Sequence, residues 1–191
     1  MLFEILSHTP TWVWVLLAFL IYRGVAAMQP RDVAPGRVLI VPIVFFVWGA
    51  TSLFAATDGL ALRLAFFIVA LLVGLAIGRA LASLSAAPRL SRGTGLIAMP
   101  GSAAPLILIV LAFAINYCGS VALAMATDLA VRAELASALA ASGGLFAGLF
   151  WGRTLGQFQR ALRTDGQPVS FATLASLVRG GAVGNAAERL S

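Results

Sequence analysis

Asn116, Tyr117, Cys118 and Ser120 form the main group of polar side chains inside a long apolar stretch. Asn116 and Ser120 are four residues apart, so in a helix they share one face. A carboxamide in hydrocarbon needs a hydrogen-bonding partner, because an unsatisfied polar group there is costly. We predict that Asn116, Tyr117 and Ser120 form a polar centre that hydrogen-bonds between helices. The alternative is that they line a solute path or a ligand pocket.

Chemistry that needs a metal, a cofactor or a buried acid has little support. His8 is the only histidine and Cys118 the only cysteine, whereas a zinc site needs about four ligands and a haem usually an axial histidine. We expect Cys118 to be a small buried hydrophobe. No Asp or Glu lies centrally in an apolar stretch, which disfavours a carboxylate proton relay. Hydrolase, P-loop and dinucleotide fingerprints are absent, so we predict no metal, no cofactor and no enzyme.

Small residues recur every four positions in two apolar stretches. Residues four apart lie on one helix face, and small residues there let two helix backbones approach closely in a membrane. The expected packing glycines are Gly74 and Gly78 in one stretch, and Gly144, Gly148, Gly152 and Gly156 in the other. We predict tight packing within one chain, with a homodimer contact or a hinge as the alternatives.

The composition is typical of a membrane protein. Hydrophobic residues make up 61% of the 191 residues and charged residues 10%, and the mean hydropathy is +0.99. Soluble domains are roughly half apolar and a quarter charged. The net charge of +6 does not indicate nucleic-acid binding, because the arginines flank apolar stretches instead of forming a patch with interleaved aromatics. We expect membrane lipids to contact the outer surface.

Hydropathy predicts an all-α polytopic membrane protein with five transmembrane helices in a compact bundle. Each crossing of a hydrocarbon core about 30 Å thick takes about 20 residues. The predicted spans cover about residues 11–28, 38–56, 60–84, 103–127 and 128–158, and Asp128 suits the N-cap of the last. They form one domain over residues 1–163, in which residues 85–102 are the longest loop. In residues 164–191 we expect a short amphipathic interfacial helix and a tail.

The arginines predict the orientation, because cytoplasmic loops carry an excess of basic residues. Eleven of the 13 basic residues fall into three groups: Arg23, Arg31 and Arg37; Arg79, Arg89 and Arg92; and Arg153, Arg160, Arg163, Arg179 and Arg189. We therefore predict that the N-terminus lies outside and the C-terminus inside. Arg23 and Arg63 are near enough to span ends for their guanidinium groups to extend to the headgroups.

Four short motifs stand at the ends of the apolar stretches. They are His8-Thr9-Pro10-x-Trp12, Gln29-Pro30-Arg31, Pro100-Gly101-Ser102 and Gly148-Leu149-Phe150-Trp151-Gly152-Arg153. Through them the chain resembles a group of small multi-pass proteobacterial inner-membrane proteins of unknown function, over most of residues 1–160. It is also loosely similar to the CcdC-like membrane proteins associated with cytochrome c biogenesis. The resemblance implies a helical fold in the bacterial inner membrane. The group leads us to expect a basic residue where this chain has Asn116.

These observations predict a non-enzymatic integral membrane protein that acts as an accessory or assembly subunit of an inner-membrane complex. Its expected partner is another membrane protein or a second copy of this chain. The alternative is a small-solute transporter or channel whose path follows Asn116, Tyr117 and Ser120. An enzyme acting on lipid ranks third, because no nucleophile and base lie at one membrane depth.

Overall fold

The described part of the chain is predominantly α-helical, as predicted. The computed structural model describes residues 11–54, 59–86, 88–90 and 97–164. The longer helices are α2 (Thr11–Ala26), α4 (Ile40–Thr51), α5 (Leu60–Leu84), α6 (Ala104–Met125) and α7 (Leu129–Thr164). The short α3 (Pro35–Val38) precedes α4, and a 3-10 turn, η1 (Ser52–Phe54), follows it. The expected interfacial helix and tail beyond Thr164 lie outside the described residues.

Among the residues that the structure describes, four helical segments are long and apolar enough to cross a membrane. They are Gly36–Phe54, Leu60–Leu84, Ala104–Met125 and Leu129–Ala161. In α2 the apolar part, Leu17–Ala26, is shorter than the roughly 20 residues that a perpendicular crossing requires. The structure therefore indicates a membrane protein with four candidate spans. The fifth predicted span, at residues 11–28, stays a prediction.

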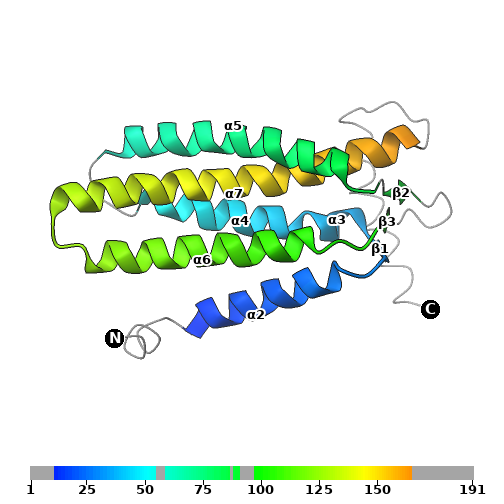
Figure 1. Cartoon of the computed structure of the whole chain (residues 1–191), viewed down its shortest axis with the longest axis horizontal. Coiled ribbons are helices and arrows are strands. Elements are labelled where there is room, and N and C mark those ends of the chain that lie inside the picture. Colours follow the sequence, from blue (N-terminus) through cyan, green and yellow to red (C-terminus); the bar gives the residue numbers. More distant parts are fainter. Residues whose placement is uncertain (1–10, 55–58, 87, 91–96, 165–191) are drawn as a thin grey trace, which may run out of the picture.

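Helix α7 is the centre of the bundle and lies between α5 and α6 (Figure 1). In an 18-residue window of its candidate span 61% of the residues are buried, against 17% to 22% in the corresponding windows of the other three spans. Its 36 residues rise about 54 Å, well beyond a hydrocarbon core of about 30 Å. Its N-terminus is capped as predicted, because the backbone N–H of Ala130 donates to Oδ1 of Asp128 at 2.7 Å. Helices α4, α5 and α6 all pack against α7, whereas α2 packs against α6.

Aromatic side chains fill the core between α4, α6 and α7. The ring of Phe45 stacks on that of Phe150 with centroids 4.4 Å apart, and it lies 5.9 Å from the ring of Trp48. Trp48 in turn lies 5.6 Å from Phe113. Phe45, Phe113 and Phe150 are at most 9% exposed. We call these four residues the aromatic layer.

A small antiparallel sheet closes one end of the bundle, which the sequence did not predict. Its strands are β1 (Arg31–Val33), β2 (Arg89–Leu90) and β3 (Ile97–Met99), in the order β1-β3-β2. Arg31 pairs with Met99, and Val33 pairs with Ile97. Val33 and Ile97 are buried, so part of the predicted polar loop 85–102 is a packed element. The sheet joins the chain after α2 to the chain before α6.

Candidate functional site

The polar centre connects α6 to α7. Asn116 is 9% exposed, and its Nδ2 donates to the backbone oxygen of Ala112 at 2.9 Å. Its Oδ1 lies 3.3 Å from Oγ of Ser142 in α7, whose single proton is shared between this oxygen and the backbone oxygen of Leu139 at 2.9 Å. Ser120 Oγ donates to the backbone oxygen of Asn116 at 2.8 Å. Both ends of the carboxamide therefore have a partner, one within α6 and one across the helix interface.

The other two residues near the polar centre turn elsewhere. Tyr117 is half-buried, and its ring stacks on that of Phe113 with centroids 5.7 Å apart and an interplanar angle of 9°. Cys118 is exposed, so the expectation that it is a buried hydrophobe is wrong. The reason is geometric, because two residues along a helix turn the side chain by about 200°, away from the face of Asn116.

The polar centre lines a cavity near the connection between α6 and α7, which we call the loop-end cavity. Its volume is about 290 Å³. The lining residues are Trp48, Thr51, Ser52, Asn116, Ser120, Leu123, Ala124, Arg132 and Leu139. The hydroxyls of Thr51 and Ser52 donate to the backbone oxygens of Trp48 and Gly49, which leaves their lone pairs to accept from a solute. The cavity can hold a small polar molecule.

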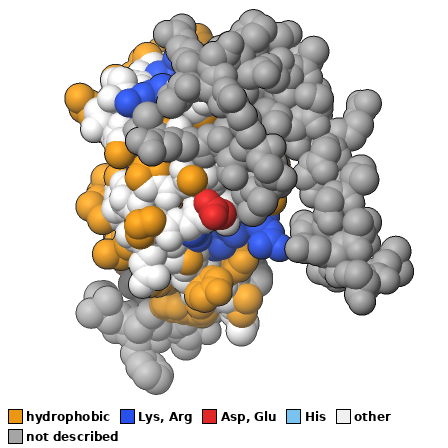
Figure 2. Space-filling model, turned by 90° about the vertical axis from the view of Figure 1, so that its right-hand side faces the viewer, with side chains coloured by type: hydrophobic (Ala, Val, Ile, Leu, Met, Phe, Trp, Pro, Cys, Tyr) orange, Lys and Arg blue, Asp and Glu red, His pale blue; other side chains and the backbone are white. Residues whose placement is uncertain are grey.

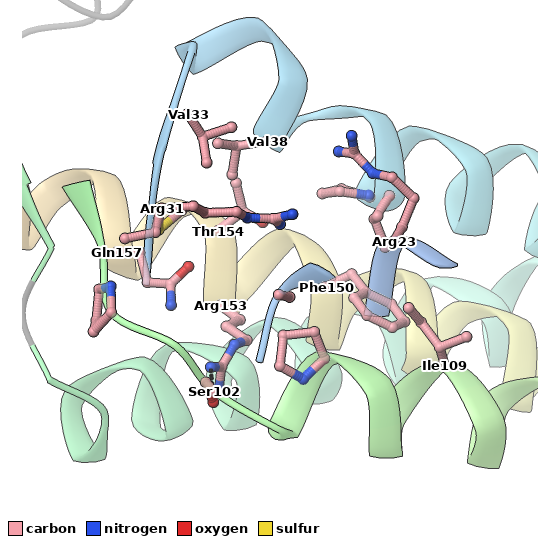
Figure 3. Close-up of a pocket in the computed structure, with 16 residues that line it drawn as sticks. Arg23, Arg31, Val33, Val38, Ser102, Ile109, Phe150, Arg153, Thr154 and Gln157 are labelled. Carbon is pink, nitrogen blue, oxygen red and sulfur yellow. Dashed lines mark hydrogen bonds between the residues drawn. The ribbon is translucent and has the colours of Figure 1, made fainter. Parts of the chain in front are cut away.

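A second cavity, of about 90 Å³, lies beside the sheet and contains three arginines; we call it the sheet-end cavity. Arg23 comes from the last turns of α2, Arg31 from the start of β1 and Arg153 from α7. Figure 3 shows the three side chains entering from different elements, with Arg153 turned toward Ser102. Arg153 is only 4% exposed, and its Nη2 donates to Ser102 Oγ at 3.2 Å.

Backbone contacts hold the chain around the sheet-end cavity. The backbone N–H of Ser102 donates to the oxygen of Ala27 at 2.8 Å. A β-carbon at Gly101 would overlap the backbone oxygen of Met28, and one at Gly24 would lie 3.0 Å from Cα of Leu106. These close approaches fix the chain after α2 against the chain before α6, so that Arg23 and Ser102 reach the same cavity.

The two cavities lie on opposite sides of the aromatic layer. Phe150 and Ile109 line the sheet-end cavity, whereas Trp48 lines the loop-end cavity. Phe45 lies between them, stacked on Phe150 and close to Trp48. The layer therefore separates an arginine-rich cavity at one end of the bundle from a hydroxyl-rich and amide-containing cavity nearer the other.

The predicted packing glycines lie where α5 meets α7. A β-carbon at Gly74 or Gly78 would overlap the backbone oxygen of Leu145 or Leu149 in α7. On α7, Gly144, Gly148 and Gly152 face the backbone oxygens of Phe67, Leu71 and Leu75 in the same way, and a β-carbon at Gly156 would lie 2.6 Å from Cβ of Ala82. These contacts all lie within one chain.

The remaining predicted arginines lie outside the sheet-end cavity. Arg37 and Arg79 are exposed, and Arg79 donates to Gln159. Arg160 donates to the backbone oxygens of Ala82 and Ser85 at the end of α5. Arg89 begins β2, Arg163 lies in the last turn of α7, and Arg92 is outside the described residues.

Arg63 departs from expectation. It is 2% exposed, and its Nε donates to the backbone oxygen of Leu53 in η1 at 2.9 Å. The expectation that its guanidinium extends to the headgroups is therefore wrong. The 3-10 turn after α4 leaves backbone oxygens without helical partners, and one of them binds Arg63 inside the bundle.

Comparison with known proteins identifies a family and no activity. The model of a family of unknown function, DUF6622, matches residues 1–170. The chain belongs to the DUF6622 family. No curated protein and no solved structure matches it, so the similarity to CcdC-like proteins stays a prediction. Both cavities lie within the part of the chain that the DUF6622 model covers.

Sequence reasoning identified the arginines of this DUF6622 protein but not the cavity that they share. It assigned Arg31 and Arg153 to membrane orientation, and Arg23 to orientation and to contact with the headgroups. Arg23 and Arg153 both lie inside predicted spans, 11–28 and 128–158. That position inside a span is the sequence signal that makes an arginine a candidate for burial. The site also depends on the pairing of β1 with β3, which short strands do not reveal.

Proposed function

We propose that this chain is a non-enzymatic protein of the bacterial inner membrane that acts as an accessory or assembly subunit of a larger membrane complex. Its partner in this proposal is another membrane protein or a second copy of the chain. The observation that carries the proposal is the position of α2. This apolar helix packs chiefly against α6 (Figure 1) and lies at the edge of the bundle.

The outward side of α2 is rich in large apolar side chains. Leu20 and Gly24 are buried, whereas Val15, Tyr22 and Val25 are more than half exposed. A helix with few contacts is among the least stable parts of a fold, unless another surface supports it. In a membrane that support comes from lipid or from a helix of a partner. We propose that a partner helix packs along this side of α2.

The distribution of charge supports the proposed orientation. Arg23, Arg31, Arg153 and Arg160 lie at the sheet end of the bundle, and Figure 2 shows arginine side chains on that face beside a small acidic group. Basic residues collect on the cytoplasmic side of inner-membrane proteins. We propose that the sheet end faces the cytoplasm and that the connection between α6 and α7 lies outside.

Site-specific photo-crosslinking in the native membrane tests the accessory role. A photoreactive residue replaces Tyr22 on α2, and the matched control replaces Leu72, which is 57% exposed on α5. We expect a discrete crosslinked protein from position 22 and none from position 72. A band of twice the chain mass identifies a second copy as the partner. If both positions give lipid adducts and no crosslinked protein, and native mass spectrometry finds a bare monomer, the proposal is excluded.

A small-solute transporter is the second candidate, and the paired cavities favour it. Two cavities separated by one layer of side chains are what alternating access requires on either side of a closed gate. Phe45 and Trp48 are then the gate, and Asn116 is part of the path. The test is anion efflux, with chloride as the probe, from liposomes containing the protein. Efflux that is unchanged by Asn116→Leu would count against this path, and absence of efflux would favour the accessory role.

A further inference from the structure

We propose that the sheet-end cavity binds a phosphate group, carried either by the headgroup of an anionic phospholipid or by a soluble phosphate ester. Neither the accessory role nor the transporter role is needed for this inference. It rests on the charge, the hydrogen-bond donors, the size and the position of the cavity.

The charge of the cavity is unbalanced. Arg23, Arg31 and Arg153 line it, and none of the lining residues that the structure describes is an Asp or Glu. Arg23 also experiences the positive charge of Arg31 and Arg37. Like charges in a partly buried site repel more strongly than in water, because the effective dielectric constant is lower. A bound anion would convert this repulsion into attraction.

The donors of the cavity are incompletely used. Nε of Arg23 is buried and has no hydrogen-bond partner among the described residues, although its Nη2 donates to the backbone oxygen of Arg37 at 2.6 Å. Arg153 uses Nη2 for Ser102, and a guanidinium carries five N–H donors in all. Its planar fork matches the oxygen atoms of a phosphate better than a single point charge does.

The size of the cavity suits a small ligand. Its volume is about 90 Å³, several times the roughly 10–15 Å³ that one water molecule requires on the same measure. A phosphate group therefore fits the cavity.

The position of the cavity agrees with a lipid headgroup. It lies where α2 ends and where α6 begins, at Ala26 and Ala104, close to the ends of the apolar segments. Apolar side chains such as Ile109 and Phe150 line the side toward the bundle core. Basic pockets between transmembrane helices at this depth are typical binding sites for anionic headgroups. A phosphate here can remain attached to acyl chains in the bilayer.

The test uses the purified full-length chain in a mild detergent. Arg31→Gln is the informative variant, because Arg31 is only half-buried and its structural role among the described contacts is the strand pairing of its backbone. Arg79→Gln is the matched control, since it removes the same charge from an exposed position on α5. Native mass spectrometry measures retention of added phosphatidylglycerol against phosphatidylcholine. Thermal unfolding with inorganic phosphate, against chloride at equal ionic strength, measures binding of a soluble anion.

We expect retained phosphatidylglycerol in the wild type and in Arg79→Gln, and affinity lower by about tenfold or more in Arg31→Gln, from the loss of one charge-assisted hydrogen bond. Stabilisation by inorganic phosphate alone, lost in Arg31→Gln, would support the phosphate site and identify a soluble ligand. Equal loss in both variants, equal retention of phosphatidylcholine, or no response to either probe would overturn the proposal.

Discussion

Ser142 of α7 donates a hydrogen bond to Oδ1 of Asn116 in α6, with the two oxygens 3.3 Å apart. It is a direct side-chain bond between the two helices, close to the loop-end cavity. Through it the only amide side chain of the described part of α6 is attached to the helix at the centre of the bundle. The strength of this hydrogen bond indicates whether the polar centre stabilises the fold or faces a solute.

The first prediction is a measurable but small coupling between Asn116 and Ser142. Hydrogen bonds between transmembrane helices contribute on average about 0.6 kcal/mol, because the unfolded chain in the membrane also finds partners. We expect a double-mutant cycle of Asn116→Ala and Ser142→Ala to give a coupling free energy of that size in SDS unfolding. Ser83→Ala is the control, since Ser83 Oγ donates within its own helix to Ala80. A coupling near zero would favour a solute-facing role for Asn116.

The second prediction concerns the contact between α5 and α7. A β-carbon at Gly148 would overlap the backbone oxygen of Leu71 and lie 2.8 Å from the nitrogen of Leu75, so both backbones would have to move. We expect Gly148→Ala to lower the free energy of unfolding by at least about 1–3 kcal/mol, the usual cost of overpacking.

Gly36→Ala is the matched control for that substitution. Gly36 lies in a helix too, and a β-carbon there would meet nothing within 4 Å. Alanine at this position should leave the stability unchanged or raise it slightly, because alanine favours helix over glycine by up to about 1 kcal/mol. Equal melting temperatures for Gly148→Ala and the wild type would contradict the close approach of the two helices.

The sequence reveals most of the helices but little of how they meet. The bounds of α5 and α6 follow from apolar length, and Asp128 indicates the start of α7, because each signal is local. The burial of Arg63 could not be predicted, since it depends on a 3-10 turn ten residues earlier. The exposure of Cys118 could have been predicted, because the helical period turns its side chain away from the face that carries Asn116.

The sheet-end cavity shows more clearly what the sequence does not reveal about tertiary structure. Its arginines come from α2, β1 and α7, and Arg31 reaches it because β1 pairs with β3. Strands of three residues carry too few positions for a period of two to stand out from chance. The residue types were therefore visible in the sequence, whereas their convergence needed the tertiary structure.

The third prediction tests the proposed orientation by cysteine labelling. In a Cys118→Ala background, Leu129→Cys places a thiol at the loop end, where Leu129 is 83% exposed, and Gly36→Cys places one at the sheet end. An impermeant maleimide added to intact cells should label position 129 and should reach position 36 only after permeabilisation, because basic ends face the cytoplasm. The reverse pattern would invert the proposed topology.

The fourth prediction concerns the anchoring of α5 by Arg160. Its guanidinium donates to the backbone oxygens of Ala82 and Ser85, at a helix end where carbonyl groups lack helical partners and attract a cation. We expect Arg160→Ala to lower the free energy of unfolding by about 1–2 kcal/mol, since bonds to charged groups are strong but this side chain is only half-buried. Arg160→Lys should recover part of the loss. Arg79→Ala is the control, because it removes an exposed hydrogen bond to Gln159, and it should lower the free energy of unfolding by less than about 1 kcal/mol. Equal losses of unfolding free energy in the two alanine variants would show that the contacts of Arg160 with the backbone oxygens contribute nothing specific.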